Sequence, residues 1–524
     1  MTNPPPALRL QFADDMFLRR HDGGASPAVN QVLWRLDGPY DADRLRDLAE
    51  HLAAGALHRR VVRARVPGAR HRWAPAGTLP VLDLRTAAVP EDGIGTWAQA
   101  EADVPLDPAR GRSWRLAAAD VVAPGDDGAV VVGGIVSLTC AHAVADGAAL
   151  IDAVVRASTR AEPIVVPAPE RGSRALLSDA ADAAGQAAAV ARWAQARARQ
   201  AARDRRAAGA ADQAEARQIE PAHAEPGHAE PGRAEPGRAE GTTPYDVAAP
   251  GAMPHGAGTG PGGAGPTIPS GAAPSSAAPT GAAPAAAVAA PGSAVAADAG
   301  WRAPVLHVEL PSERVAEAAA ERGGTPNTWF VTFLARLVHA TGRFPGEPVP
   351  VALPVATRGP DDPRANSTKI ARVTLPADVL DARDLGWVRA AAKEAYAAVG
   401  QAEPGAAPVP LELVQMLPDT VVSRLPQPPV AAALASNLGK PPAGYTQAPG
   451  GSVRAVATLS HYQGATAAEL RAAGGGLVAF CTTVGATTTL SVAALDPDRV
   501  PDAGTLRTLV LAEADAWRLP AVPW

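Results

Sequence analysis

The sequence predicts an α/β fold made of two ordered parts that are separated by a long linker. Apolar strand-like runs alternate with amphipathic helical patterns in residues 1–160 and again in residues 301–524. Between them, residues 161–300 hold a basic helical stretch and then a tract dominated by Ala, Pro and Gly. This tract has few aromatic or branched side chains to offset the entropy of ordering, so we expect it to be disordered. The expected organisation is an N-terminal subdomain, a linker and a C-terminal subdomain.

The composition excludes several classes of protein. The chain has 524 residues and a formal net charge of −5, which gives no reason to expect a nucleic-acid partner. Cys140 and Cys481 both lie in apolar strand-like runs, so we expect buried, reduced thiols and no disulfide framework. No charged-then-apolar leader opens the chain, and no apolar run approaches the roughly 20 residues that span a bilayer. We expect a cytoplasmic protein without a metal centre, and a peripheral contact with a membrane is left open as an alternative.

Local patterns in the first part predict a strand followed by a capped helix. The run Val32–Leu36 is apolar and alternating, and Asp41 is placed to cap a helix over Ala42–Ala54. The basic, alternating segment His58–Arg65 predicts an edge strand with a solvated face. Farther along, Ala181–Arg206 is rich in Ala and Arg and predicts a helix. A solvated linker helix is favoured there over a membrane-surface helix, because its apolar side chains are nearly all small.

A histidine follows the second strand of a predicted hairpin. Strands are expected at Arg115–Val122 and at Ala129–Leu138, and the second leads to His142, Asp146 and Gly147. An imidazole titrates near neutral pH, so a fixed one can take a proton from a hydroxyl or amine and return it later. Asp146 would hold the turn by pairing with an arginine, and Gly147 would permit a backbone conformation that other residues resist. The alternative is a structural histidine at a strand end, because the His-x-x-x-Asp-Gly string alone is a weak motif.

The second ordered part repeats the alternation of strands and helices. Caps, glycine stops and apolar periodicity mark the boundaries of its elements. The expected elements are a strand at 305–310, a helix that is capped by Ser312 and runs to Arg322, a helix that begins at Thr325–Pro326, a strand at 349–358, a hairpin over 475–493 and a helix within 496–517.

Several segments resemble one enzyme superfamily. His142-x-x-x-Asp146-Gly147 after an apolar strand resembles the active-site motif of the chloramphenicol-acetyltransferase-like superfamily. This superfamily includes condensation domains, polyketide-associated acyltransferases and the wax ester synthase/diacylglycerol acyltransferase family, which the chain resembles most. Further similar segments follow in the order of that family: Asp14–Leu18, Pro105–Trp114, Thr325–Thr328, Val349–Arg358, Asp361–Asn366 and Ser436–Gly439. The chain departs from the family pattern at Ser113, Ala141, Thr328 and Leu438.

The resemblance implies two chloramphenicol-acetyltransferase-like subdomains that meet in a V, with the histidine in a channel between them. On that template His142 is the general base that deprotonates an acceptor, which then attacks the carbonyl of an acyl thioester. The residues implied to support the site are Asp146, Gly147 and Arg358, with Arg358 as the partner of Asp146. The candidates to bind the oxyanion or the substrate are Ser436 and Asn437.

Three functions stay open under this resemblance. The first is an O-acyltransferase that moves an acyl group from acyl-CoA to a hydroxyl acceptor such as a long-chain alcohol or diacylglycerol. The second is a condensation or polyketide-associated acyltransferase that takes the acyl group from an acyl carrier protein onto an alcohol or amine. The third is an inactive acyltransferase fold that serves as a binding scaffold. No resident cofactor is implied, because the thioester is a substrate.

Overall fold

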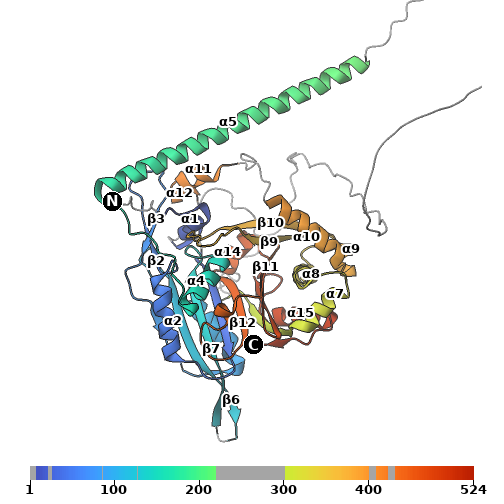
Figure 1. The fold of residues 1–524 in the computed structure, drawn as a ribbon. Coiled ribbons are helices and arrows are strands. Elements are labelled where there is room, and N and C mark those ends of the chain that lie inside the picture. The colour runs from blue at the N-terminus through green and yellow to red at the C-terminus, as the bar shows by residue number, and fades with distance from the viewer. Residues whose placement is uncertain are drawn as a thin grey trace, which may run out of the picture. The chain divides into compact units, whose positions relative to one another are not determined.

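A computed structural model describes most of the two ordered parts. The described residues are 8–21, 26–84, 87–126, 128–219, 301–399, 409–422 and 431–524. They form two mixed sheets, each with its own helices, so the predicted α/β fold with two sheet-and-helix subdomains is confirmed (Figure 1). The tract 220–300, predicted to be disordered, lies outside the described residues.

The first sheet combines strands from both parts of the chain. Its order is β12-β1-β7-β6-β4, and β5 pairs with β6. The strands are β1 (Ala28–Leu36), β4 (Val81–Asp83), β5 (Val89–Pro90), β6 (Trp114–Gly125), β7 (Gly128–Ala141) and β12 (Val453–Tyr462). β4 and β5 run parallel to β6, and the other neighbours are antiparallel. Because β12 comes from the C-terminal part, a division at residue 300 does not separate the two sheets.

Helices and a small ribbon complete the N-terminal part. β2 (Arg59–Val62) and β3 (Arg72–Pro75) pair as a separate two-stranded ribbon. The helices are α1 (Phe12–Arg19), α2 (Ala42–Ala54), the 3₁₀ turn η2 (Glu91–Gly93), α3 (Ile94–Ala102), α4 (Gly147–Thr159) and α5 (Gly172–Ile219). The cap predicted for α2 is confirmed, since the Asp41 carboxylate accepts from the backbone N–H groups of Asp43 and Arg44.

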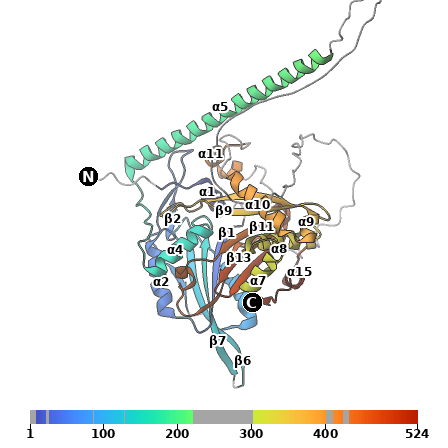
Figure 2. The same cartoon turned by 45° about the vertical axis from the view of Figure 1, so that its right-hand side comes forward.

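The hairpin that leads to the histidine is longer and more exposed than expected. The strand predicted at Ala129–Leu138 is part of β7, but burial begins only at Gly133. The residues before Gly133 extend with the end of β6 as an arm that projects below the sheet (Figures 1 and 2). The prediction of a wholly buried strand was therefore wrong for its first residues, because an apolar run does not reveal where a sheet ends.

The basic helix is anchored at its start. The helix predicted at Ala181–Arg206 lies within α5, which begins nine residues earlier, at Gly172. The buried Asp179 carboxylate accepts from Arg9 at 2.7 Å and from the Arg65 backbone N–H at 2.9 Å. The first turns of α5 are thus tied to the N-terminal part by charge-assisted hydrogen bonds. Most residues from Ala181 to Arg206 are exposed, as predicted for a solvated linker helix.

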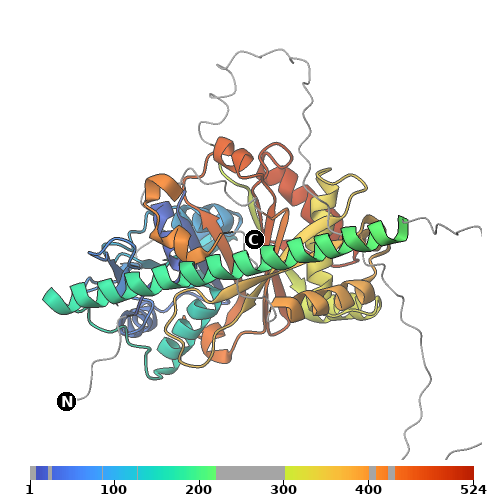
Figure 3. The ribbon, with the colours of Figure 1, turned by 90° about the horizontal axis from the view of Figure 1, so that it is seen from above.

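The second sheet is built entirely from the C-terminal part. Its order is β10-β9-β11-β13-β14-β8-β15. The strands are β8 (Val305–Pro311), β9 (Val349–Ala356), β10 (Thr368–Leu375), β11 (Ala433–Gly439), β13 (Leu477–Val484), β14 (Thr487–Ala494) and β15 (Val522–Pro523). The helices are α7 (Ser312–Ala320), α8 (Pro326–Ala340), α9 (Ala377–Ala382), α10 (Leu385–Val399), α11 (Leu411–Met416), α12 (Asp419–Val422), α13 (Ala443–Thr446), α14 (Ala467–Ala472) and α15 (Ala503–Ala516). Seen from above, the blue N-terminal elements and the yellow-to-red C-terminal elements lie side by side (Figure 3).

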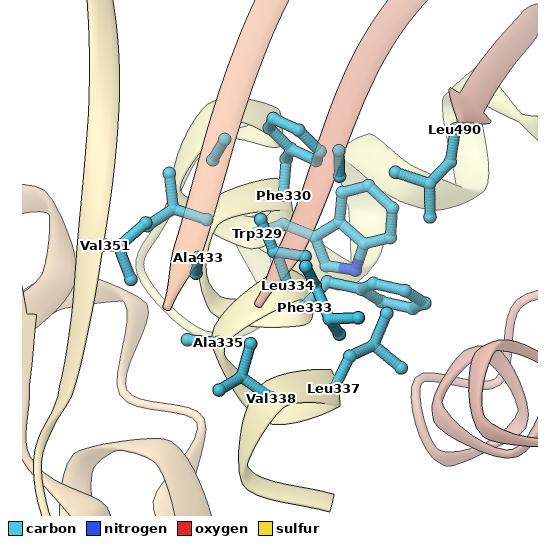
Figure 4. Packing of buried hydrophobic residues seen from close by; sticks show 14 of the residues in the cluster. Trp329, Phe330, Phe333, Leu334, Ala335, Leu337, Val338, Val351, Ala433 and Leu490 are labelled. Carbon is cyan, nitrogen blue, oxygen red and sulfur yellow. The ribbon is translucent and has the colours of Figure 1, made fainter. Parts of the chain in front are cut away.

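Helix α8 forms the centre of the second core. It begins at Pro326, as predicted, and Thr325 caps it by accepting from the Thr328 backbone N–H. Its side chains Trp329 and Phe333 pack under strands β9, β11 and β14 (Figure 4). The expected cap at Ser312 was wrong, because Pro311 holds that position and Ser312 is the first residue of α7.

The cysteines and the helices agree with two further expectations. Cys140 and Cys481 are both buried and free. Among the described residues, none of the helices combines the length and the apolar character that crossing a bilayer requires.

Candidate functional site

His142 lies in a turn that is held from both parts of the chain. β7 ends at Ala141 and α4 begins at Gly147, so the turn covers residues 142–146. The His142 backbone N–H donates to the Ala28 carbonyl at 2.9 Å. The Asp146 backbone N–H donates at 3.0 Å to the carbonyl of Ala365, in the loop between β9 and β10. The turn is therefore clamped between the first sheet and a loop of the second.

The His142 imidazole is half-buried and oriented by two side chains. The Phe17 ring of α1 stacks on it, with ring centroids 3.8 Å apart and planes 20° apart. On its edge, Nδ1 lies 3.1 Å from the Asn366 side-chain oxygen Oδ1. No described residue provides a hydrogen-bond partner for Nε2. The protein thus holds the ring through one of its two nitrogens.

Burial keeps the imidazole neutral. Desolvation lowers the pKa of His142 below its ordinary value of 6.5, because a charged ring is poorly solvated there. Its own backbone carbonyl, the charge of Asp146 and the hydrogen bond to Asn366 oppose this effect without reversing it. A neutral ring at neutral pH is the form that can accept a proton.

A buried carboxylate of α1 lies behind Asn366. Asp14 Oδ1 accepts from the Asn366 backbone N–H at 3.0 Å and from its side-chain Nδ2 at 2.9 Å. Asp14 Oδ2 accepts from the Gln11 backbone N–H at 2.8 Å and from Trp73 Nε1 at 3.3 Å. Burial raises the pKa of Asp14 from 3.8 to about 6, and the hydrogen bonds and the charge of Arg59 limit the rise.

Asp146 organises the junction between the turn and the second sheet. Its Oδ1 accepts from the Ala149 backbone N–H at 2.8 Å and thereby caps α4. Its Oδ2 accepts from the Ser367 backbone N–H at 2.7 Å and from the Thr368 hydroxyl at 3.0 Å. The carboxylate is buried, and these hydrogen bonds go to α4 and to the loop before β10 rather than to the imidazole. Its structural role stays a prediction.

Arg358, the expected partner of Asp146, lies 3.5 Å from it. Its shorter hydrogen bonds go to the carbonyls of Asp362 at 2.6 Å and Arg364 at 2.7 Å. The guanidinium therefore holds the backbone of the loop that carries Asn366, in addition to its ion pair with Asp146.

Arg59 contradicts the expectation for the basic edge strand. Its guanidinium is buried, stacks over Trp73, and donates to the carbonyls of Val144 at 2.6 Å and Pro363 at 3.0 Å. Desolvation lowers its pKa to about 10. Rather than facing solvent, this side chain joins the histidine turn to the loop after β9.

Gly147 does not need the conformational freedom of glycine. It is the first residue of α4, and its φ is not in the left-handed region. A Cβ at this position would meet only the Leu438 Cδ2 atom, at an ordinary contact distance of 3.5 Å. The expected backbone role was therefore wrong, and the residue marks where the end of β11 approaches α4.

Ser436 and Asn437 lie on β11, at the side of the second sheet. The Asn437 amide donates to Asn327 at 2.9 Å and accepts from the Gly439 backbone N–H at 2.8 Å. Among the described residues, no hydrogen bond joins Ser436 or Asn437 to His142, and their role at an oxyanion or substrate stays a prediction.

A pocket of about 220 Å³ lies behind the turn. Its wall includes Ala145, Arg59 and Arg358 but not His142. The channel implied at the imidazole stays a prediction. In the described part of the chain, no cluster of three or more His, Cys, Asp or Glu side chains is placed to hold a metal ion.

The contacts of Asp14, Asn366 and Arg59 were missed from the sequence. Asp14 and Asn366 lie in segments with family resemblance but carry no local pattern that brings them together across 352 positions. Arg59 looks like any other member of a basic run. No local signal in the run His58–Arg65 distinguishes Arg59 from the other basic residues.

Solved structures align with nearly the whole chain at low identity. The condensation domain of the Monacolin K polyketide synthase MokA is 12% identical, with 98% of this chain and 96% of that chain covered and a TM-score of 0.48. The wax ester synthase/diacylglycerol acyltransferase from Marinobacter aquaeolei VT8 is 12% identical, with 97% and 99% covered and a TM-score of 0.46. Polyketide synthase associated protein 5 from Mycobacterium tuberculosis is 11% identical, with 98% and 99% covered and a TM-score of 0.45.

No family model and no curated protein matches the chain. At identities of 11–12% and TM-scores of 0.45–0.48, the structural likeness assigns neither a specific family nor an activity. Both are therefore inferred below from the residues of the turn.

Proposed function

We propose that this chain is an acyltransferase that moves an acyl group from a thioester to a hydroxyl acceptor, with His142 as general base. One observation carries the proposal: the imidazole is held through Nδ1, is kept neutral by burial, and has Nε2 without a partner among the described residues. The His-x-x-x-Asp-Gly segment places this ring at the end of a strand in both the sequence and the fold.

The reaction proceeds in two steps at the thioester carbonyl. Nε2 takes the proton of the acceptor hydroxyl while the hydroxyl oxygen bonds to the thioester carbonyl carbon, and a tetrahedral oxyanion forms. The oxyanion then collapses, the C–S bond breaks, and the imidazolium returns the proton to the thiolate. The products are an ester and a free thiol, and no bond between acyl group and enzyme is required.

The acyl donor defines two versions of this function. An acyl-CoA with a long-chain alcohol or diacylglycerol as acceptor follows from the segments that resemble the wax ester synthase/diacylglycerol acyltransferase family. An acyl carrier protein as donor is favoured by Ser436–Gly439 and by Thr328, which depart from that family. An inactive scaffold is the remaining alternative.

Replacement of His142 tests the base. We expect His142→Ala to lower the rate of acyl transfer by about 10²–10⁴-fold, the usual contribution of general base catalysis. The assay is mass spectrometry of the products from acyl-CoAs and from acylated carrier protein, each with a panel of alcohols and amines. His51→Ala, on the half-exposed surface of α2, is the matched control and should leave turnover unchanged. Equal turnover in His142→Ala and the wild-type protein would contradict the proposal.

A further inference from the structure

We propose that Asn366 and Asp14 are positioning residues, which hold His142 in the tautomer that carries its proton on Nδ1. The kinetic consequence of this inference rests on the proposed function. Its spectroscopic consequence does not depend on any substrate.

The orientation of the Asn366 amide follows from its surroundings. Three acceptors lie around Nδ2: Asp14 Oδ1 at 2.9 Å, the His142 carbonyl at 3.0 Å and the Ala143 carbonyl at 3.3 Å. A carbonyl oxygen placed there would face acceptors only, so this end of the amide must be the NH₂ group. The other end, which points at His142, is therefore the oxygen.

Asp14 fixes this orientation. Its two oxygens accept four N–H groups, two of them from Asn366 itself. The side chain of Asp14 is fully buried, and its neighbours hold it from α1, from β3 and from the loop after β9. Loss of the acceptor at Oδ1 would leave the buried Asn366 amide without its strongest partner.

The proton of His142 is placed by elimination. Asn366 Oδ1 can only accept, so the 3.1 Å contact requires a hydrogen on Nδ1. In a neutral ring the second nitrogen, Nε2, must then carry the lone pair. The hydrogen-bonded series Asp14–Asn366–His142 thus leaves Nε2 as the proton acceptor on the substrate side. Besides Asp14 itself, the charged groups near this series are Asp146, Arg59 and Arg358.

The tautomer can be measured directly. Long-range ¹H–¹⁵N spectra of the full chain with labelled histidine distinguish a protonated Nδ1 from a protonated Nε2. The His142 signals are assigned by their absence in His142→Gln. We expect the wild-type protein to show the Nδ1–H tautomer, and Asn366→Ala to show a mixture or the Nε2–H tautomer.

A matched variant separates positioning from general loss of structure. Asn30 is also a buried asparagine, and it joins Ala145 to Ser460 without touching the imidazole. Asn30→Ala should keep the Nδ1–H tautomer. A wild-type spectrum with the proton on Nε2 overturns the inference even if Asn366→Ala does not fold.

Kinetics distinguish the inference from the proposed function. Where the wild-type protein transfers acyl groups, Asn366→Ala should lower kcat by about 10–100-fold with KM nearly unchanged, as expected for a residue that acts through another. If Asn366→Ala kept both the wild-type kcat and the Nδ1–H tautomer, the inference would be overturned, but the assignment of His142 as general base would stand. An Nδ1–H tautomer without acyl transfer from any donor would instead leave the inference standing and contradict the proposed function.

Discussion

The core around α8 and the turn around His142 are stabilised by different forces. In the first, Trp329, Phe330 and Phe333 pack against apolar strands, and burial of apolar surface is the main stabilising term (Figure 4). In the second, buried side chains such as Asp14 and Asp146 are held by hydrogen bonds that cross between the two parts of the chain. Stability of the core should therefore be insensitive to pH, whereas the turn should respond to pH.

The largest effect is expected in the core. Trp329 is fully buried, with Phe333 at 5.2 Å and Trp517 at 6.4 Å between ring centroids. Trp329→Ala should lower the free energy of unfolding by about 3–5 kcal/mol, because it removes a large side chain and leaves a cavity. Urea denaturation measures this change, and Leu79→Ala, at an 87% exposed residue, is the control. If the free energy of unfolding lost in Trp329→Ala varied strongly with pH, the proposed difference between this core and the His142 turn would be contradicted.

An intermediate, pH-dependent effect is expected at Asp14. Its pKa rises from 3.8 to about 6 in the folded chain, so the folded state binds this proton more tightly than the unfolded state does. The stability contributed by the protonated form is present below pH 3.8 and is lost as the pH rises through about 6. The loss is on the order of 3 kcal/mol at about 1.4 kcal/mol per pKa unit.

Comparison with Asp14→Asn isolates this effect. The variant lacks the ionisation, so the wild-type stability relative to the variant should fall as the pH rises from 3.8 to above 6. Urea denaturation of both proteins over this range measures the difference, and other carboxylates cancel from it. A difference that stays constant with pH would show that Asp14 does not titrate in this way.

The smallest effect is expected at the cap of α8. Thr325→Ala removes the acceptor for the Thr328 N–H and should destabilise the chain by about 1 kcal/mol at all pH values near neutrality. Thermal denaturation gives the shift, and Thr325→Ser, which keeps the hydroxyl, should restore most of it. A shift as large as that of Trp329→Ala would mean that capping, not packing, dominates this core.

The same contrast explains how much could be predicted from the sequence. The cap of α2 at Asp41, the start of α8 at Pro326 and the histidine after a strand were all predictable, because each depends on neighbours a few positions away. The two-part α/β organisation followed from the composition of the tract between the parts.

The remainder depends on contacts between distant residues. The Arg59 hydrogen bond to Pro363 joins positions 304 residues apart, and an alternating basic run gives no indication of it. The pairing of Asp14 with Asn366 likewise needs both sheets in place. Gly147 was misjudged for another reason: a glycine in a motif suggests backbone freedom, yet here it starts an ordinary helix.

Strand β12 makes the two parts of the chain dependent on one another. It leaves the C-terminal part and pairs with β1 from Ala28 to Leu36, on the opposite side from β7. A fragment that ended before residue 300 would expose this whole row of unpaired amides and carbonyls, a template for edge-to-edge aggregation. Co-expression of the two fragments, with strand donation between them, is thus the physically sensible way to divide the molecule.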